Sequence, residues 1–236
     1  MKIEIVQVTK QFIRKQRGTN VFEAVKPLDL TLEEGTVTAL SGSSGSGKST
    51  LLNMTAGLLA PTRGTVRYGD TDLYSLEDAA LSRFRGEHIG LIPQGQSALF
   101  ALTVRENILL PAALAGKAMP EDGDYAGELM ERLGIADLAD VMPKELSGGE
   151  LRRMAIARAL IRRPEVILAD EPTGDLDEEN TQIVLELLRE LADAGRTILL
   201  VTHDALPEHI ADVCCTMKNG ELAGNNWSIL KQDNQN

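Results

Sequence analysis

The sequence contains little of what several broad classes of protein require. No apolar run approaches the roughly 18 residues of a membrane-spanning helix, and the N-terminal MKIEIVQVTK lacks the apolar core of a signal peptide. Basic residues number 24 against 35 acidic ones, and a net charge of −11 argues against a protein that coats nucleic acid. We therefore expect a cytoplasmic protein with no nucleic-acid partner.

Cysteine is scarce as well. The two cysteines, Cys214 and Cys215, are adjacent within ADVCCTM, a segment typical of a buried strand. Neighbouring cysteines rarely reach disulfide geometry, and although His209 lies close by, no second cluster completes a zinc set. We interpret both thiols as small apolar core residues.

The hydrophobic pattern predicts an α/β protein. Residues 1–40 and 61–73 have the alternation and the turn residues of strands and hairpins, whereas residues 75–145 are largely helical in pattern. The apolar strands EVILAD and RTILLVTH then alternate with an amphipathic helix. Continuous apolar strands alternating with helices indicate a parallel sheet that is buried on both faces.

A glycine-rich loop follows the predicted strand TVTALS. Residues 42–49, GSSGSGKS, fit the pattern G-x-x-x-x-G-K-[ST] between a strand and a helix. Its backbone N–H groups can wrap phosphate oxygens, Lys48 can reach the β- and γ-phosphates, and the Ser49 hydroxyl can bind Mg²⁺. A flexible linker would not place Lys-Ser at the head of a helix. The predicted ATP-binding residues here are Gly42, Ser43, Ser44, Gly45, Ser46, Gly47, Lys48, Ser49 and Thr50.

The segment VILADEP supplies two carboxylates at the end of an apolar strand. In a parallel sheet that strand end lies at the same edge as the phosphate loop. We expect Asp170 to hold the Mg²⁺ shell and Glu171 to act as the general base that polarises water. The alternative is that both carboxylates only cap the chain as it leaves the strand at Pro172.

A second anion-binding feature lies about a hundred residues after the first. ELSGGELRRMAIARAL, residues 145–160, opens a helix with two glycines and so presents free N–H groups and a positive end. Two such sites cannot hold one phosphate from the same side. We therefore predict a head-to-tail homodimer with twofold symmetry, in which residues 147–149 of one copy close over ATP held by the phosphate loop of the other.

Together LSGGE, the phosphate loop, VILADEPTGDLD and LLVTH resemble the nucleotide-binding subunit of an ATP-binding cassette (ABC) transporter, along nearly the whole chain. The resemblance implies a P-loop NTPase (RecA-like) core with an antiparallel β-subdomain and a helical signature-motif subdomain. Within a single domain 1–236 we expect four parts. These are the β-subdomain and P-loop at 1–75, the Q-loop and helical subdomain at about 76–162, Walker B, D-loop and switch histidine at 163–230, and a polar tail at 231–236.

The resemblance also assigns roles around the γ-phosphate, with Glu171, His203 and Lys48 as the catalytic set. Gln94, in IGLIPQ, is similar to the Q-loop glutamine, which senses Mg²⁺ and the γ-phosphate. His203 matches the switch histidine. The signature residues that would contact the γ-phosphate from the opposite copy are Ser147, Gly148 and Gly149.

Two further roles follow from the resemblance, and each has an alternative. Asp177, in GDLD, matches the D-loop aspartate at the dimer interface, but it can also cap the helix that begins at Glu178. Phe12 occupies the place of the aromatic residue that stacks on adenine. Phe22 is a nearby competitor for that place.

The sequence departs from the family pattern at two positions. Glu150 stands where many relatives have glutamine, and because a carboxylate would repel phosphate we expect it to point away from the nucleotide. Pro93 precedes Gln94 and is expected to stiffen the Q-loop. The arginines of LRRMAIARALIRRP are interpreted as solvated or paired along their helix.

TVRENILLPAALAG, with LADEPTGDLD and VTHD, resembles the LolD, MacB and FtsE group, which serves lipoprotein release, macrolide export and cell division. This implies a separate membrane permease with a large extracytoplasmic domain, and a cassette that it holds at the cytoplasmic face of the membrane. Leu99 and Phe100 suit a groove for a permease helix, or they pack into their own subdomain's core. An importer cassette, or a soluble ABC ATPase on ribosomes or DNA, is the alternative function.

Overall fold

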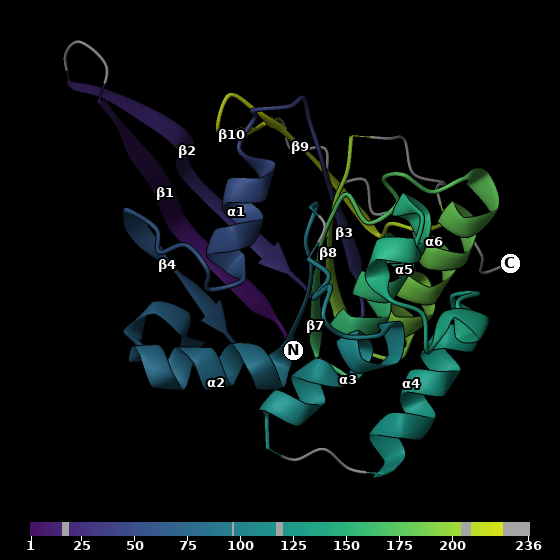
Figure 1. The fold of residues 1–236 in the computed structure, drawn as a ribbon. Coiled ribbons are helices and arrows are strands. Elements are labelled where there is room, and N and C mark those ends of the chain that lie inside the picture. The colour runs from purple at the N-terminus through teal and green to yellow at the C-terminus, as the bar shows by residue number, and fades with distance from the viewer. Residues whose placement is uncertain (16–18, 96, 117–119, 204–208, 224–236) are drawn as a thin grey trace, which may run out of the picture.

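The computed structural model describes residues 1–15, 19–95, 97–116, 120–203 and 209–223. These residues form two sheets with helices between and beside them, as Figure 1 shows. The polar tail predicted at 231–236 lies outside the described residues.

The smaller sheet is antiparallel and has the strand order β2-β1-β4-β5. Its strands are β1 (Ile3–Lys15), β2 (Thr19–Leu32), β4 (Arg63–Tyr68) and β5 (Thr71–Asp72). Strands β1 and β2 form a long hairpin that projects from the body of the molecule in Figure 1. In this hairpin Phe12 pairs with Phe22, and Ile13 pairs with Val21.

The larger sheet has six strands in the order β10-β9-β3-β8-β7-β6. They are β3 (Val37–Ser41), β6 (Ile89–Ile92), β7 (Val166–Asp170), β8 (Thr197–Val201), β9 (Val213–Lys218) and β10 (Glu221–Ala223). All neighbours pair in parallel except β9 and β10. Because β3, β8, β7 and β6 are adjacent and parallel, the segments that follow them begin at one edge of the sheet.

Helices cover both faces of this sheet. They are α1 (Lys48–Thr55), α2 (Asp78–His88), α3 (Val104–Leu114), α4 (Pro120–Arg132), α5 (Gly148–Leu160) and α6 (Glu178–Asp193). Helix α1 lies between the two sheets, and α3 to α6 lie on the opposite side of the parallel sheet (Figure 1). Side chains of β7 and β8 alternate between the two resulting cores, for instance Ile167 on the side of α5 and Leu168 on the side of α1. The prediction of an α/β protein with a doubly buried parallel sheet is confirmed.

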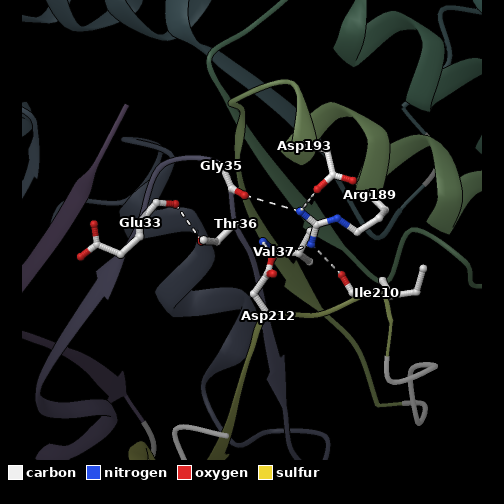
Figure 2. A network of polar contacts seen from close by, with 8 residues as sticks. All are labelled: Glu33, Gly35, Thr36, Val37, Arg189, Asp193, Ile210 and Asp212. Atoms are coloured by element: carbon white, nitrogen blue, oxygen red, sulfur yellow. Dashed lines mark hydrogen bonds and ion pairs between the residues drawn. The ribbon is translucent and has the colours of Figure 1, made fainter. Parts of the chain in front are cut away.

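A network of polar contacts fastens α6 to the start of β3 (Figure 2). The Arg189 guanidinium donates to Asp212 Oδ2 at 2.5 Å and to the carbonyl of Ile210 at 3.2 Å. Asp212 is 8 % exposed and also accepts from the backbone N–H of Val37 at 2.9 Å. One carboxylate therefore joins a helix, the first residue of β3 and the segment that leads into β9.

Two features of the fold differ from the sequence-based expectation. Strand β6 lies inside the region whose pattern is helical, and four residues are too short a run to reveal it. Cys214 and Cys215 do lie in a strand, β9, but both are half-buried rather than enclosed. Burial raises the pKa of both thiols, that of Cys215 to about 11.

Candidate active site

The order of the strands brings most of the predicted site residues into one cavity. The cavity has a volume of about 590 Å³, and its lining comes from the β1–β2 hairpin, the P-loop after β3, and the segments that follow β6, β7 and β8. The lining residues are Phe12, Phe22, Ala24, Ser44, Gly45, Ser46, Gly47, Lys48, Ser49, Thr50, Gln94, Asp170, Glu171 and His203. Positions more than a hundred residues apart thus surround a single space of nucleotide size.

The P-loop has a backbone that only glycine can adopt at two points. Gly42 has φ 144°, and a Cβ there would lie 2.2 Å from the carbonyl oxygen of Met217. Gly47 has φ 107°, and a Cβ added there would lie 2.4 Å from the carbonyl oxygen of Ala24. The Lys48 ammonium donates to the carbonyls of Gly42 at 2.6 Å and Ser43 at 3.2 Å. The carbonyls of the loop therefore hold the ammonium group of Lys48, the first residue of α1.

The end of β7 positions a carboxylate beside His203. Glu171 has φ 51°, a left-handed conformation that is uncommon outside glycine, and its N–H donates to the carbonyl of Val201 at 2.9 Å. Its Oε2 lies 2.8 Å from Nδ1 of His203. The strained backbone thus directs the Glu171 carboxylate toward β8, where His203 follows the strand.

The other carboxylate, Asp170, has an environment that suits a hard cation. Its Oδ1 is buried and has no hydrogen-bond partner among the described residues. Burial raises the pKa of Asp170, while a hydrogen bond from Ser49 acts in the opposite direction. A buried oxygen without a partner, next to a hydroxyl, is the donor set that Mg²⁺ prefers when phosphate oxygens complete its shell. Within the described ranges no three His, Cys, Asp or Glu side chains cluster as a metal site by themselves.

The end of the cavity formed by the β1–β2 hairpin is apolar. Phe12 and Phe22 are cross-strand partners, 38 % and 41 % exposed, and both line the cavity together with Ala24. The Lys10 ammonium lies 5.4 Å from the centre of the Phe12 ring. The hairpin register thus presents two aromatic rings where the sequence analysis favoured one.

The signature residues lie outside this cavity, at the exposed N-terminus of α5. Ser147 is the N-cap: its Oγ accepts from the N–H of Glu150 at 3.3 Å, and its own N–H donates to Glu150 Oε2 at 2.7 Å. The Ser147 hydroxyl also donates to Glu150 Oε2, at 2.8 Å. The hydrogen bond from the backbone N–H of Ser147 is the main cause that lowers the pKa of Glu150. Glu150 folds back onto the cap of its own helix, so both side-chain and backbone donors of Ser147 are engaged.

The D-loop aspartate caps the following helix. Asp177 is the N-cap of α6, and its Oδ1 accepts from the N–H of Asn180 at 2.8 Å. That backbone contact is the main cause that lowers the pKa of Asp177. The capping role is confirmed, and a contact across a dimer interface remains a prediction.

The α5 arginines are neither mainly solvated nor paired along their own helix, so that interpretation was wrong for them. Arg152 is buried and donates to the carbonyls of Pro93 and Gln94, both at 2.6 Å. Arg153 donates to the carbonyls of Leu133 at 2.9 Å and Gly134 at 3.2 Å. Arginine has five donors and no acceptor, so loop carbonyls are suitable partners. The helix uses its arginines to hold neighbouring loops.

Comparison with known proteins identifies the family. A family model described as ABC transporter matches residues 25–174. The chain belongs to the ABC transporter family. A macrolide export ATP-binding/permease protein MacB of Rhodopseudomonas palustris is 47% identical over 188 residues, 80% of this chain and 29% of that protein. A MacB protein of Salmonella choleraesuis is 39% identical over 223 residues, 94% of this chain and 34% of that protein.

Solved structures agree with this assignment. A dimeric structure of the ATP-binding cassette MJ0796 bound to ADP and Pi superposes with a TM-score of 0.86 at 33% identity, covering 94% of this chain and 97% of that one. A second dimeric structure of MJ0796 gives a TM-score of 0.87. The ATP-binding subunit of an ABC transporter, 23% identical with a TM-score of 0.81, shares the fold. The predicted P-loop fold and the resemblance to the MacB group are confirmed.

The ABC cassette described here spans about a third of the length of the MacB relatives. None of its described helices is long and apolar enough to cross a membrane.

Proposed function

We propose that this ABC cassette hydrolyses ATP at a site shared between two copies, and that the cycle of closure and opening works a membrane permease. The observation that carries the proposal is the separation of two anion-binding elements. The P-loop, Asp170, Glu171, Gln94 and His203 line one cavity, whereas the N-terminus of α5 lies outside it, exposed. A second copy that faces the cavity would bring that N-terminus to the γ-phosphate.

The cavity residues divide the chemistry of phosphoryl transfer to water. The P-loop N–H groups and Lys48 would bind the phosphates, and Glu171 would accept a proton from the attacking water. The 2.8 Å contact between His203 Nδ1 and Glu171 Oε2 orients that carboxylate. Phe12 and Phe22 would stack on the base.

The same cavity fits a magnesium ion. Ser49 and Asp170 would hold it, the latter through its buried unpartnered oxygen, with Gln94 at the cavity wall. The ion, when bound, neutralises charge on the phosphate oxygens.

A Glu171→Gln variant tests the shared site. Without the general base, hydrolysis falls while ATP binding persists, so ATP should convert the variant from monomer to a stable dimer in sedimentation velocity. The control is the double variant Glu171→Gln with Ser147→Arg. Arginine at position 147 blocks the N-terminus of α5 but leaves the P-loop intact, so this variant should bind ATP and stay monomeric. A variant that turns over ATP briskly would remove Glu171 from the role of base, and one that binds ATP but stays monomeric would refute closure.

A groove beside the Q-loop is the proposed permease contact. It has a volume of about 1070 Å³ and is lined by α2, α3 and the segment after Gln94, with Leu99, Leu110 and Leu114 among its apolar residues. Leu99, Phe100 and Leu114 are 46 %, 54 % and 77 % exposed. Buried Asn107 fixes the loop, accepting from the N–H of Leu99 at 2.8 Å and donating to its carbonyl at 3.0 Å. An open groove that combines exposed leucines with the charged side chains of Arg83, Glu87 and Arg158 suits a short amphipathic helix of a membrane protein.

Co-purification from detergent-solubilised membranes, with the Glu171→Gln variant and ATP, identifies the partner. We expect a separate permease with few spans and a large outer domain, which holds the cassette at the cytoplasmic face. Leu114→Asp should lose that protein, and Leu58→Asp, at another exposed leucine that does not line the groove, should keep it. A many-span permease with a binding protein would indicate an importer, and ribosomes or DNA in its place would contradict a transport role.

A further inference from the structure

Arg152 lies at the junction of three elements that the proposed cycle uses. It belongs to the second turn of α5, the helix whose N-terminus is capped by Ser147. Its side chain leaves that helix and reaches the Q-loop, residues 93–95. A small cavity of about 40 Å³ at this junction is lined by Gln94, Gly148, Arg152 and Asp175, among others, so the Q-loop, the signature turn and the D-loop meet there.

The contact itself is short, buried and bidentate. The two guanidinium nitrogens each donate to a separate carbonyl, those of Pro93 and Gln94, at 2.6 Å. Arg152 is only 9 % exposed. Burial is the main cause that lowers the pKa of Arg152, and Asp175, Asp170 and Glu171 act in the opposite direction. A buried cation that is held by two neutral carbonyls fixes geometry more than it adds stability.

The Q-loop at this point has little freedom of its own. The ring of Pro93 fixes its own φ. Arg152 holds the carbonyl of Pro93 and that of Gln94. Gln94 therefore extends into the nucleotide cavity from a fixed base, because it lines that cavity as well as the small one at Arg152.

We propose that Arg152 is a positioning residue that makes the Q-loop and the signature helix move as one body. A displacement of Gln94 when nucleotide fills the cavity is passed through Arg152 to α5, and so to residues 147–149 at its N-terminus. The sensing of ATP in one site thereby sets the orientation of the surface that closes the other site. This inference rests on the proposed function of a shared site.

The neighbouring Arg153 provides a matched control. It lies on the same helix and also donates to two loop carbonyls, those of Leu133 and Gly134. These two residues directly follow α4 and are not part of the Q-loop. Arg152→Gln and Arg153→Gln therefore remove the same kind of contact from the same helix. Only the first removes the connection to Gln94.

The test measures ATP-driven dimerisation of the full chain in the Glu171→Gln background. Arg152→Gln should raise the ATP concentration at half-dimerisation by roughly tenfold, the scale of losing a charge-assisted hydrogen bond. ADP affinity of the monomer and the thermal midpoint should match those of Arg153→Gln. In the Glu171-containing chain, kcat should fall more than KM rises, and Arg152→Lys should recover part of the loss.

A double-mutant cycle decides whether Arg152 acts through Gln94. Arg152→Gln added to Gln94→Ala should weaken dimerisation no further than Gln94→Ala alone. The inference would be overturned if Arg152→Gln and Arg153→Gln changed the ATP concentration at half-dimerisation equally, or if the effects of Arg152→Gln and Gln94→Ala were additive. Neither result would affect the shared site. Failure of the Glu171→Gln chain itself to dimerise with ATP would instead overturn the proposed function.

Discussion

Nδ1 of His203 lies 2.8 Å from Oε2 of Glu171, across the ends of two adjacent parallel strands. Glu171 is nearly buried, with a side chain 10% exposed, whereas that of His203 is 65% exposed. The histidine thus contacts the carboxylate through Nδ1, and both residues line the same cavity.

His203→Ala should lower kcat by roughly a hundredfold, the scale of losing a group that orients proton transfer. ATP affinity should change little, because the P-loop and the aromatic end of the cavity are untouched. Steady-state ATPase kinetics and equilibrium nucleotide binding separate the two quantities. An unchanged kcat would contradict the orienting role, and a large loss of affinity would assign His203 to ground-state binding instead.

Replacing Phe12 or Phe22 tests the two-ring base site. Each alanine variant should weaken ATP binding by about 1 kcal/mol, a rise in Kd of roughly fivefold. The double variant should be weaker than either. Tripolyphosphate, which has no base, provides the control and should bind all variants alike. If Phe22→Ala leaves Kd unchanged, the base stacks on Phe12 alone.

Glu150→Gln should have opposite effects on the helix and on the dimer. Helix α5 loses a charged partner at its positive end, so the free energy of unfolding should fall by about 0.5–1 kcal/mol. ATP-driven dimerisation should become tighter, since no carboxylate then competes with phosphate for the donors of Ser147. Urea unfolding and sedimentation in the Glu171→Gln background give the two values, and a weaker dimer would contradict the competition.

The pH dependence of the same cap has a definite sign. The pKa of Glu150 is lowered in the folded protein, so its charged form stabilises the fold above the ordinary carboxylate pKa. This contribution is lost as the pH falls through the lowered folded-state pKa. The stability difference between the wild-type chain and Glu150→Gln should therefore be full at neutral pH and shrink on acidification. A difference that grows in acid would have the wrong sign.

Arg189→Met tests the network of Figure 2. Removing the cation takes the Arg189 ion pair away from the buried Asp212, which should cost about 3 kcal/mol of stability. Arg132→Met is the matched control, because its partner Glu190 is largely exposed and the pair should contribute under about 1 kcal/mol. Urea midpoints of both variants decide the matter. Equal small losses would show that Asp212 is satisfied by the Val37 N–H and its surroundings.

The sequence predicted the parts of the site that depend on local pattern. Residues 42–49 carry their glycines at the positions where positive φ and close approach require them, and the apolar run that ends at Asp170 reveals its strand. The buried parallel sheet followed from the same apolar runs. These features need only neighbouring residues to be recognised.

Contacts between distant segments were not predictable in this way. Whether Phe22 faces the cavity depends on the register of the β1–β2 hairpin, which shifts three times along the pair. Arg152 looks like a solvated helical arginine until the fold brings a loop 58 residues away against it. Strand β6 is recognisable only once β7 provides its partner.

Complementation between two inactive variants tests whether a second copy completes the site. Lys48→Ala removes the lysine proposed to bind phosphate, and Ser147→Arg blocks the N-terminus of α5. If the site is shared, a mixed dimer has one complete site, formed by the intact P-loop of the Ser147→Arg chain and the intact signature of the Lys48→Ala chain. Random mixing should restore up to about a quarter of wild-type ATPase activity. A mixture no more active than its separate components would contradict a shared site.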